Sequence, residues 1–459
     1  MTVPPEVVRA FAAPVPRYTS YPTAPHFHGG IGPDTYAGWL ESLPAKAKLS
    51  LYLHIPFCDT LCWFCGCQTK ITRHYKPVAA YLEMLAKETR LVGALVPSDA
   101  EVSHIHWGGG SPTMLNPDDI RRLADATRAS FRFAETVEFA IEVDPRGLDA
   151  PRMDALATAG LGRVSIGVQD FDPTVQQAIN RIQSFEETRA AVEGFRGRGV
   201  TSLNIDAIYG LPHQTLARLE STLRQVIQLK PDRIALFGYA HVPWMKKHQN
   251  MIDEATLGDV VERYRQAEHA AALLVAGGYV RIGIDHFALP HDSLAKAAKA
   301  GTLQRNFQGY TVDPTDALIG LGASSISSLP QGYVQNHAAT DQYIRKIEAG
   351  GLATERGIAL SAEDRLRRQI IERLMCALAF SRGDLRSDGL QPEGLQPEGL
   401  ESDILREARG VIADDVYGFI QETPLGFSIT DQGRPFLRAI AARFDAYLPK
   451  QKARHSLAV

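Results

Sequence analysis

The chain has 459 residues, a mass of 50.3 kDa and 45% apolar residues, and 49 Lys plus Arg against 52 Asp plus Glu give it a formal net charge of −3. This composition indicates a globular protein with a large core and excludes a disordered chain, a collagen and a dedicated nucleic-acid binder. No apolar run reaches the ~20 residues of a membrane helix. The N-terminal residues hold three prolines by Pro14 and lack the apolar stretch of a signal peptide, so we expect a cytoplasmic protein.

Short apolar runs alternate with helix-like segments from about Ser50 to Tyr239. The expected strands are Leu51–Phe57, Val102–Trp107, Val137–Val143, Val164–Val168, Leu203–Ile208 and Ile234–Tyr239. The expected helices are Pro77–Val92, Pro117–Ser130, Met153–Ala159, Thr174–Ile179, Glu186–Arg198 and Gln214–Leu229. Such alternation predicts parallel βα units with right-handed crossovers, closed into a barrel or open as a doubly wound sheet. In either architecture, ligands bind at the carboxyl ends of the strands.

The alternation fades after Tyr239. Residues Asn306–Ser328 are rich in Gly and Ser and would suit a pocket lining, while Leu360–Phe380 and Leu405–Tyr447 have a mainly helical pattern. A tandem GLQPE repeat at residues 389–398 indicates a duplicated linker without function. We therefore expect an N-terminal extension over residues 1–48, a catalytic domain over 49–330 and a mainly helical C-terminal domain over 331–459.

Four of the five cysteines lie within ten residues, in the pattern Cys58-x3-Cys62-x2-Cys65-x-Cys67. This density favours a metal site over disulfides. A structural zinc site usually takes its thiolates from two separated knuckles, whereas three thiolates at this spacing can hold three corners of a [4Fe–4S] cluster and leave one iron open. The pattern favours the cluster, with zinc as the alternative. Cys376 stands in an apolar stretch and is interpreted as core packing.

Polar residues follow several of the expected strands. Gly108–Gly110, Glu142, Asp144, Gln169 and Asp206 all lie at or near strand ends, so they are candidates for one site shared with the cysteines. Each also has a plainer interpretation, such as an ion pair of Glu142 or Asp144 with Arg146. His54 and His106 are interpreted as buried structural groups, and His286 is the better candidate for a site. Arg17 and Arg181 are candidates for binding carboxylates.

The cysteine pattern after the first strand resembles the radical S-adenosylmethionine (SAM) enzymes. A narrower resemblance, to the oxygen-independent coproporphyrinogen III oxidase family of haem biosynthesis, covers the chain from Pro16 onward apart from the repeat. It rests on PRYTSYPTA (Pro16–Ala24), YLHIPF (Tyr52–Phe57), WGGG (Trp107–Gly110), IEVDPR (Ile141–Arg146), GVQDF (Gly167–Phe171), NIDAIYGLP (Asn204–Pro212) and NFQGYT (Asn306–Thr311). The resemblance implies an α/β fold, a partial (β/α)6 barrel with an N-terminal extension that covers the substrate site and a mainly helical C-terminal domain.

The resemblance also implies the cofactors. Cys58, Cys62 and Cys65 would bind a [4Fe–4S] cluster, and two SAM molecules would bind beside it. The positions implied for the first SAM are Tyr52, Gly109, Glu142 and Ile326. Those implied for the second are Phe64, Gly110, Ser111, Gln169, Arg181, Asp206 and Ala240. Ser111 stands where Thr is commoner in the family, and it keeps the hydroxyl. Cys67 is implied to be needed for catalysis in a role that stays open.

The implied reaction is the oxidative decarboxylation of two propionates of coproporphyrinogen III to vinyl groups, giving protoporphyrinogen IX. A 5′-deoxyadenosyl radical from SAM would abstract the unactivated hydrogen, which no side-chain base can remove. The implied partners are coproporphyrinogen III and a reductant protein such as flavodoxin or ferredoxin, with no nucleic acid and no membrane span, and a monomer is the default. A related haem chaperone and a haem-opening radical enzyme are the alternatives. Cys67 and Pro16–Ala24 count against the chaperone.

Overall fold

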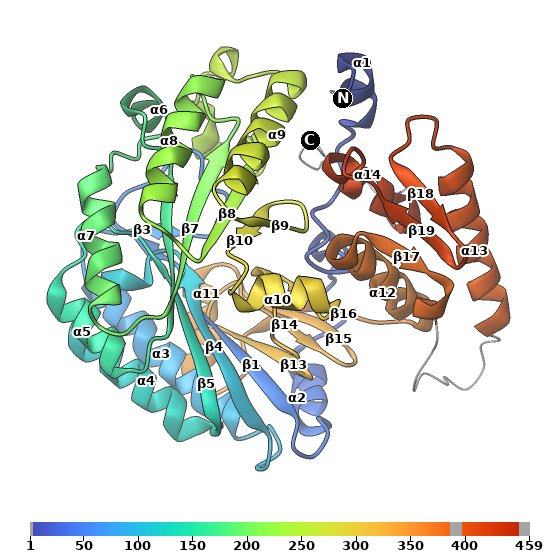
Figure 1. The fold of residues 1–459 in the computed structure, drawn as a ribbon. Helices are drawn as coiled ribbons and strands as arrows, with labels where there is room; N and C mark the ends of the chain where they lie inside the picture. The colour runs from blue at the N-terminus through green and yellow to red at the C-terminus, as the bar shows by residue number, and fades with distance from the viewer. Residues whose placement is uncertain (1–2, 386–396, 449–459) are drawn as a thin grey trace.

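The computed structural model describes residues 3–385 and 397–448, so most of the GLQPE repeat (residues 389–396) lies outside the described residues. Its centre is a 12-stranded sheet in the order β16-β15-β14-β13-β1-β4-β5-β6-β7-β8-β10-β9 (Figure 1). Seven neighbouring strands run parallel. They are β13 (Ala317–Leu321), β1 (Lys48–Ile55), β4 (Glu101–Gly109), β5 (Arg132–Val143), β6 (Arg163–Gln169), β7 (Ser202–Tyr209) and β8 (Arg233–Gly238).

All six expected strands are present, which confirms the repeated βα pattern. Strand β13 was not predicted from the sequence, and it pairs with β1 on the side away from β4. Antiparallel strands extend the sheet at both edges. They are β14 (Ile326–Leu329), β15 (Gly332–Asn336) and β16 (Thr354–Ala359) at one edge, and β10 (His286–Ala288) and β9 (Val280–Ile282) at the other. The sheet therefore runs past the expected domain boundary at residue 330.

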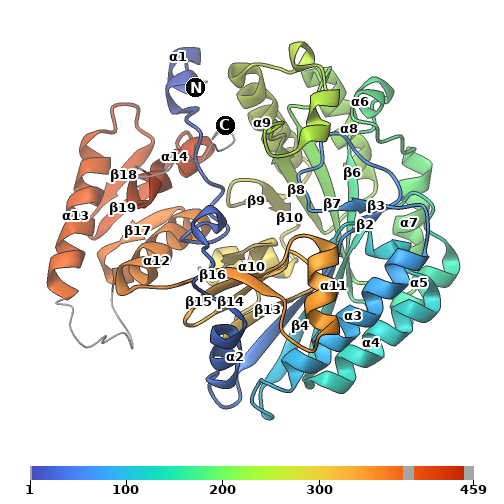
Figure 2. The ribbon, with the colours of Figure 1, turned by 180° about the vertical axis from the view of Figure 1, so that it is seen from behind.

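Side chains alternate between a buried apolar face and a more polar face in β6 and along most of β7. In β6, Val164, Ile166 and Val168 are buried in the large hydrophobic core beneath the helices. Ser165 and Gly167 between them face a cavity on the inner side. The helices cover the outer face of the curved sheet (Figures 1 and 2), so the polar inner face is left to bind ligands. This arrangement confirms the expected partial barrel.

Six helices of the barrel match the expected segments closely. They are α3 (Lys76–Gly93), α4 (Pro117–Ser130), α5 (Ala150–Thr158), α6 (Pro173–Ala178), α7 (Phe185–Arg196) and α8 (Leu216–Gln228). The sequence did not predict three further helices, α9 (Val260–Ala276), α10 (Ser293–Ala300) and α11 (Thr340–Glu348). Asn116 caps α4 as expected, because its side chain accepts a hydrogen bond from the Asp119 amide at 2.8 Å. No helix within residues 3–385 and 397–448 is long and apolar enough to cross a membrane.

The C-terminal unit has its own hydrophobic core and includes a small three-stranded sheet beside its helices. Its helices are α12 (Ala362–Ala377), α13 (Pro397–Ala413) and α14 (Leu437–Ala441), and its strands are β17 (Ala379–Ser381), β18 (Ile420–Thr423) and β19 (Gly426–Ile429). The N-terminal segment begins with α1 (Pro5–Phe11), runs between this unit and the barrel, and returns to the sheet through α2 (Pro33–Glu41) (Figures 1 and 2). Val8, Tyr18 and Tyr21 are buried in the core of the C-terminal unit, so the segment joins the two parts.

Candidate active site

The cysteine loop follows β1 and opens onto one cavity. Cys58 is the last residue of β2 (Phe57–Cys58), which pairs with β3 (Lys70–Ile71) and closes the loop at its base. The neighbouring α6 connection holds the middle of the loop: the Trp63 amide donates to the Ile179 carbonyl at 2.9 Å, and the Asn180 side chain donates to the Leu61 carbonyl at 2.8 Å. The cavity has a volume of ≈ 890 Å³, and we call it the cysteine cavity.

Twelve of the fifteen residues expected in the site line the cysteine cavity. They are Cys58, Cys62, Phe64, Cys65, Cys67, Gly109, Gly110, Ser111, Glu142, Gln169, Arg181 and Asp206. The other three lie elsewhere. Tyr52 does not line the cysteine cavity, and its hydroxyl hydrogen-bonds to His54 Nδ1 at 3.0 Å. Ala240 lines a neighbouring cavity, and Ile326 packs in a small cluster with Phe27 and Tyr333.

Asp144 organises two arginines beside Cys62. Its carboxylate lies 2.6 Å from Arg146 Nη2 and 3.1 Å from Arg181 Nη1, and a guanidinium nitrogen of each arginine lies 3.6 Å from the Cys62 sulfur. The ion pair with Arg146 is thus present, and Arg181 joins it from 37 residues away. Burial raises the pKa of Asp144, but the two arginines outweigh burial and hold it below its ordinary value. Arg181 is 6% exposed and its Nε has no hydrogen-bond partner, so it can bind a further acceptor.

Glu142 bridges the glycine run and the inner histidines. One carboxylate oxygen accepts the Gly109 amide at 2.9 Å and the other lies 3.4 Å from His106 Nε2. Burial raises the pKa of this carboxyl, but His106 and the Gly109 N–H together lower it below its ordinary value. Glu142 is therefore a carboxylate at neutral pH, and it faces the cysteine cavity as an acceptor for a cationic group.

Asp206 connects the cysteine cavity to a second cavity inside the barrel. It lines both, together with Glu142 and Ser165. Its oxygens accept hydrogen bonds from Ser165 Oγ at 2.9 Å and Asn204 Nδ2 at 2.7 Å. Burial raises the pKa of Asp206 to about 6 despite these bonds. Gln169, at the end of β6, has a φ of 69°, a conformation that non-glycine residues seldom adopt.

Cys67 differs from the other three cysteines of the loop in its position. It is the exposed one, whereas Cys62 is buried and Cys58 and Cys65 are half-buried. Its amide donates to the Cys65 sulfur at 3.4 Å, and its thiol also hydrogen-bonds to that sulfur, which lowers the pKa of Cys65 and raises that of Cys67. The thiol donor set suits iron, although no three His, Cys, Asp or Glu side chains in the described ranges form a site for a single metal ion.

Three residues that the sequence analysis did not single out hold the cysteine loop from the far side. Lys246 Nζ donates to the Cys67 carbonyl at 2.9 Å, His248 Nε2 lies 2.7 Å from the Cys65 carbonyl, and Gln249 Nε2 donates to the Phe64 carbonyl at 3.0 Å. They follow β8 in an irregular segment with no periodic pattern. Nothing in the sequence pattern marks them, because their role depends on a contact across about 180 residues.

Comparisons with known proteins agree with this geometry. Residues 52–226 match the model of the Radical SAM superfamily. The chain is 47% identical to an oxygen-independent coproporphyrinogen III oxidase of Paracoccus denitrificans over 95% of both chains, and 47% identical to one of Bradyrhizobium diazoefficiens over 97% of both. A solved structure of coproporphyrinogen III oxidase (HemN) from Escherichia coli, described as a radical SAM enzyme, matches with a TM-score of 0.87 and 38% identity, over 94% of this chain and 97% of that one. The chain therefore belongs to the oxygen-independent coproporphyrinogen III oxidase family of radical SAM enzymes.

Proposed function

We propose that this chain catalyses the oxygen-independent oxidative decarboxylation of two propionates of coproporphyrinogen III to vinyl groups, giving protoporphyrinogen IX in haem biosynthesis. The observation that carries the proposal is one cavity that gathers the cysteine loop, Glu142, Arg181 and Asp206, in a chain that is 47% identical to a coproporphyrinogen III oxidase over 95% of its length. When bound, a reduced iron–sulfur cluster and SAM supply the carbon radical that abstracts the propionate hydrogen.

The proposal assigns the cofactors to particular residues. Cys58, Cys62 and Cys65 bind a [4Fe–4S] cluster through three thiolates. One SAM binds at Tyr52, Gly109, Glu142 and Ile326, and a second at Phe64, Gly110, Ser111, Gln169, Arg181, Asp206 and Ala240. Cys67 takes part in catalysis at the exposed rim of the cavity.

In this proposal, side chains of the protein bind and orient SAM and shield the reacting carbon of the substrate from water. Glu142 accepts hydrogen bonds from a SAM amino group, and the free Nε of Arg181 donates to a SAM carboxylate. Asp206 accepts from ribose hydroxyls between the two cavities. The N-terminal extension covers the substrate site and excludes water from the reacting carbon.

Anaerobic turnover tests this function. The protein, reconstituted with iron and sulfide and then reduced, is given SAM and coproporphyrinogen III, and the tetrapyrrole mass, methionine and 5′-deoxyadenosine are followed. Loss of two carboxyl groups with matching SAM cleavage supports the proposal. Cys58→Ala should abolish both the cluster absorbance and turnover. Cys376→Ala is the matched control, because that cysteine is buried in a small core cluster and should leave the iron content unchanged.

Two outcomes of the same assay would overturn the proposal. Cleavage of SAM without decarboxylation would indicate a radical enzyme with another substrate, such as one that opens haem. Stoichiometric haem binding without decarboxylation would indicate the chaperone.

We also propose that a flavodoxin-like electron carrier docks beside the cysteine loop, in a reducing compartment such as the cytoplasm, and that the enzyme is a monomer. Trp244, Met245 and Met251 are 48%, 65% and 60% exposed, which leaves apolar side chains at the surface of the segment whose Lys246 contacts the Cys67 carbonyl. Lys247 is exposed beside them. An apolar patch with lysines next to the cluster loop suits an acidic carrier protein.

This docking surface has a direct test. Lys247→Glu and Met245→Glu should slow SAM cleavage driven by reduced flavodoxin at least ~10-fold, and leave cleavage driven by dithionite unchanged. An equal effect on both reductants would refute the docking surface. Light scattering reports the oligomeric state of the same samples.

A further inference from the structure

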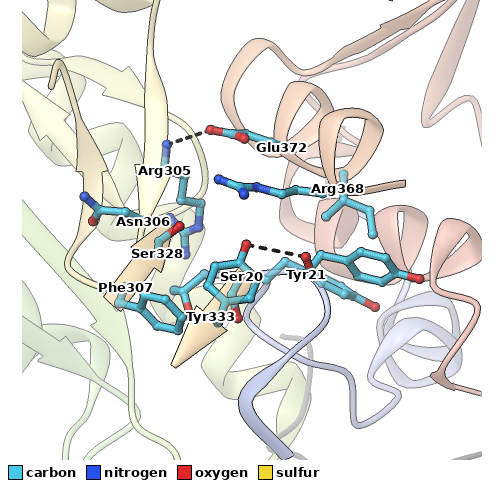
Figure 3. Close-up of a pocket in the computed structure, with 12 residues that line it drawn as sticks. Ser20, Tyr21, Arg305, Asn306, Phe307, Ser328, Tyr333, Arg368 and Glu372 are labelled. Atoms are coloured by element: carbon cyan, nitrogen blue, oxygen red, sulfur yellow. Dashed lines mark hydrogen bonds between the residues drawn. The ribbon is translucent and has the colours of Figure 1, made fainter. Parts of the chain in front are cut away.

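Two cavities lined by arginines lie where the N-terminal segment passes between the barrel and the C-terminal unit. The first arginine pocket, of ≈ 390 Å³, lies between Tyr18–Tyr21, the start of β11 (Gln304–Asn306) and α12 (Figure 3). The second arginine pocket, of ≈ 700 Å³, lies between Arg17, the end of β8 and α9. The two are neighbours, because residues 17 and 18 are consecutive and Arg305 Nη2 donates to the Arg17 carbonyl at 3.4 Å.

The cations of the first arginine pocket have no anionic hydrogen-bond partner. Arg305 Nε and Nη1 are buried without a hydrogen bond, and the guanidinium lies 4.5 Å from the centre of the Tyr310 ring. The Arg368 side chain, stacked 5.4 Å from the Tyr333 ring centre, makes no hydrogen bond or ion pair with any described residue. Figure 3 shows both guanidinium groups reaching into the pocket from opposite walls. Glu372 lines the same pocket, but it accepts only the backbone amide of Arg305, at 3.4 Å.

The second arginine pocket has a similar excess of positive charge. Its two acids are already paired, Glu268 with Arg281 at 3.0 Å and Asp285 with His286 at 2.7 Å. Arg17 and Arg263 donate only to the backbone carbonyls of Gly238 and Tyr239, which carry no net charge, and Arg263 Nε has no partner. Burial, and to a smaller degree Arg17, lowers the pKa of Arg263.

A partly buried cation without a hydrogen-bonded counter-charge costs free energy. Asp285 attracts Arg305 and Glu372 attracts Arg368, but neither acid forms an ion pair with its arginine, so carboxylates of a ligand would complete the hydrogen bonds of these guanidinium groups. Guanidinium forks match carboxylates, and two separate arginine pairs call for a ligand with at least two carboxylates. The second arginine pocket also adjoins the cavities of the candidate active site, which supports binding of the same ligand in both. Phe237 lines the second arginine pocket and the barrel-interior cavity, which shares Asp206 with the cysteine cavity.

We propose that the two arginine pockets bind separate carboxylates of one polycarboxylate ligand, one at Arg305 and Arg368 and the other at Arg17 and Arg263. This inference rests on the proposed function, in which these groups are propionates that are not reacting. The arginines anchor the macrocycle at the mouth of the barrel, with another edge directed toward the cysteine cavity. They are positioning residues and take no part in the radical step.

The test measures binding and needs neither cluster reduction nor turnover. Coproporphyrin III, a stable tetracarboxylate, is titrated into the full chain, and so is its tetramethyl ester, which has the same ring without charges. Arg368→Gln and Arg263→Gln should each weaken coproporphyrin III binding by ~10- to 100-fold and leave binding of the ester unchanged. Arg224→Gln, in an exposed ion pair with Glu220 on α8, is the matched control and should change neither affinity.

Thermal unfolding separates a binding role from a structural one. Removing a partly buried cation that has no ion-pair partner should leave the melting temperature of the ligand-free protein unchanged or raise it. The increase in melting temperature on adding coproporphyrin III should shrink. Wild-type affinity in both variants, or equal loss for acid and ester, would overturn the inference. Arginine-dependent binding without decarboxylation would contradict only the proposed function, and turnover with arginine-independent binding would contradict only this inference.

Discussion

Gly109 is a position where a single added methyl group should disturb the candidate site through both backbone strain and a side-chain clash. Its φ is 105°, which side-chain-bearing residues rarely adopt, and a Cβ built there would lie 2.3 Å from Cε1 of the His54 ring. Gly109→Ala therefore adds backbone strain and also displaces His54. The absence of a side chain at Gly109 therefore leaves room for the His54 ring.

The size of the effect follows from the contacts of His54. Strain at such a φ costs ~1–3 kcal/mol. The ring would also lose its hydrogen bonds to Tyr52 Oη at 3.0 Å and to the Gln68 carbonyl at 3.2 Å, each contributing ~1 kcal/mol. We expect Gly109→Ala to lower the free energy of unfolding by ~3–5 kcal/mol.

Gly147→Ala is the matched comparison, since Gly147 has a φ of 68° but nothing within 4 Å of the added Cβ. It should lose only the strain, ~1–2 kcal/mol. Urea unfolding of the apo-protein measures both variants, with midpoints compared at equal slope. The double variant Gly109→Ala/His54→Ala should cost less than the sum of its single variants, because the clash is then absent. Equal losses for the two glycines, or additive losses in the double variant, would refute the reasoning.

Two further predictions concern buried charge. The pKa of Asp206 is raised to about 6, so the protonated form stabilises the fold fully below the unfolded pKa of ~4 and that contribution is lost as pH rises through 6. Asp206→Asn should therefore gain ~1 kcal/mol relative to wild type between pH 5 and pH 7 in urea unfolding, and a pH-independent difference would contradict this. Asp292 is 6% exposed, pairs with Arg233 at 2.8 Å and caps α10, so Asp292→Ala should lower the free energy of unfolding by ~3–5 kcal/mol. Glu220→Ala, which removes an ion pair with the exposed Arg224, should cost much less. Similar losses in the two variants would contradict the role of burial.

The repeated βα units could be predicted because their signals are local. Strands β1, β4, β5, β6 and β7 carry apolar residues and are each followed by a helix with an apolar face, and caps such as Asn116 mark helix starts. Strand β13 lacks those signals. It is five residues long and no crossover helix connects it to the strand before it in the chain. It forms by pairing with β1 more than 260 residues earlier, a contact that no local pattern reveals.

Some features of the candidate site could also be predicted from the sequence, and others could not. The cysteine spacing and the polar strand ends could be predicted, because parallel strands bring their carboxyl ends to one edge of the sheet. Arg181 joining Asp144 was not predicted, and neither were the contacts of Lys246 with the cysteine loop. A lone arginine or lysine in a sequence most often indicates a solvated surface. Only the fold shows which of them are buried.

The near-neutral net charge is compatible with the arginine pockets, because net charge acts at long range whereas the pockets act at hydrogen-bond distance. The net charge of −3 governs the field beyond a Debye length, ~8 Å at physiological salt, and there it attracts no polyanion. Arg263 and Arg305 act within hydrogen-bond distance of a ligand, where their buried atoms are screened little. The association rate of a carboxylate ligand should therefore depend only weakly on salt concentration. Selectivity for the ligand should arise after it has contacted the arginines. Composition alone could not reveal these pockets, because the four arginines assigned to the ligand come from four separate parts of the chain and acids elsewhere balance them in the net charge.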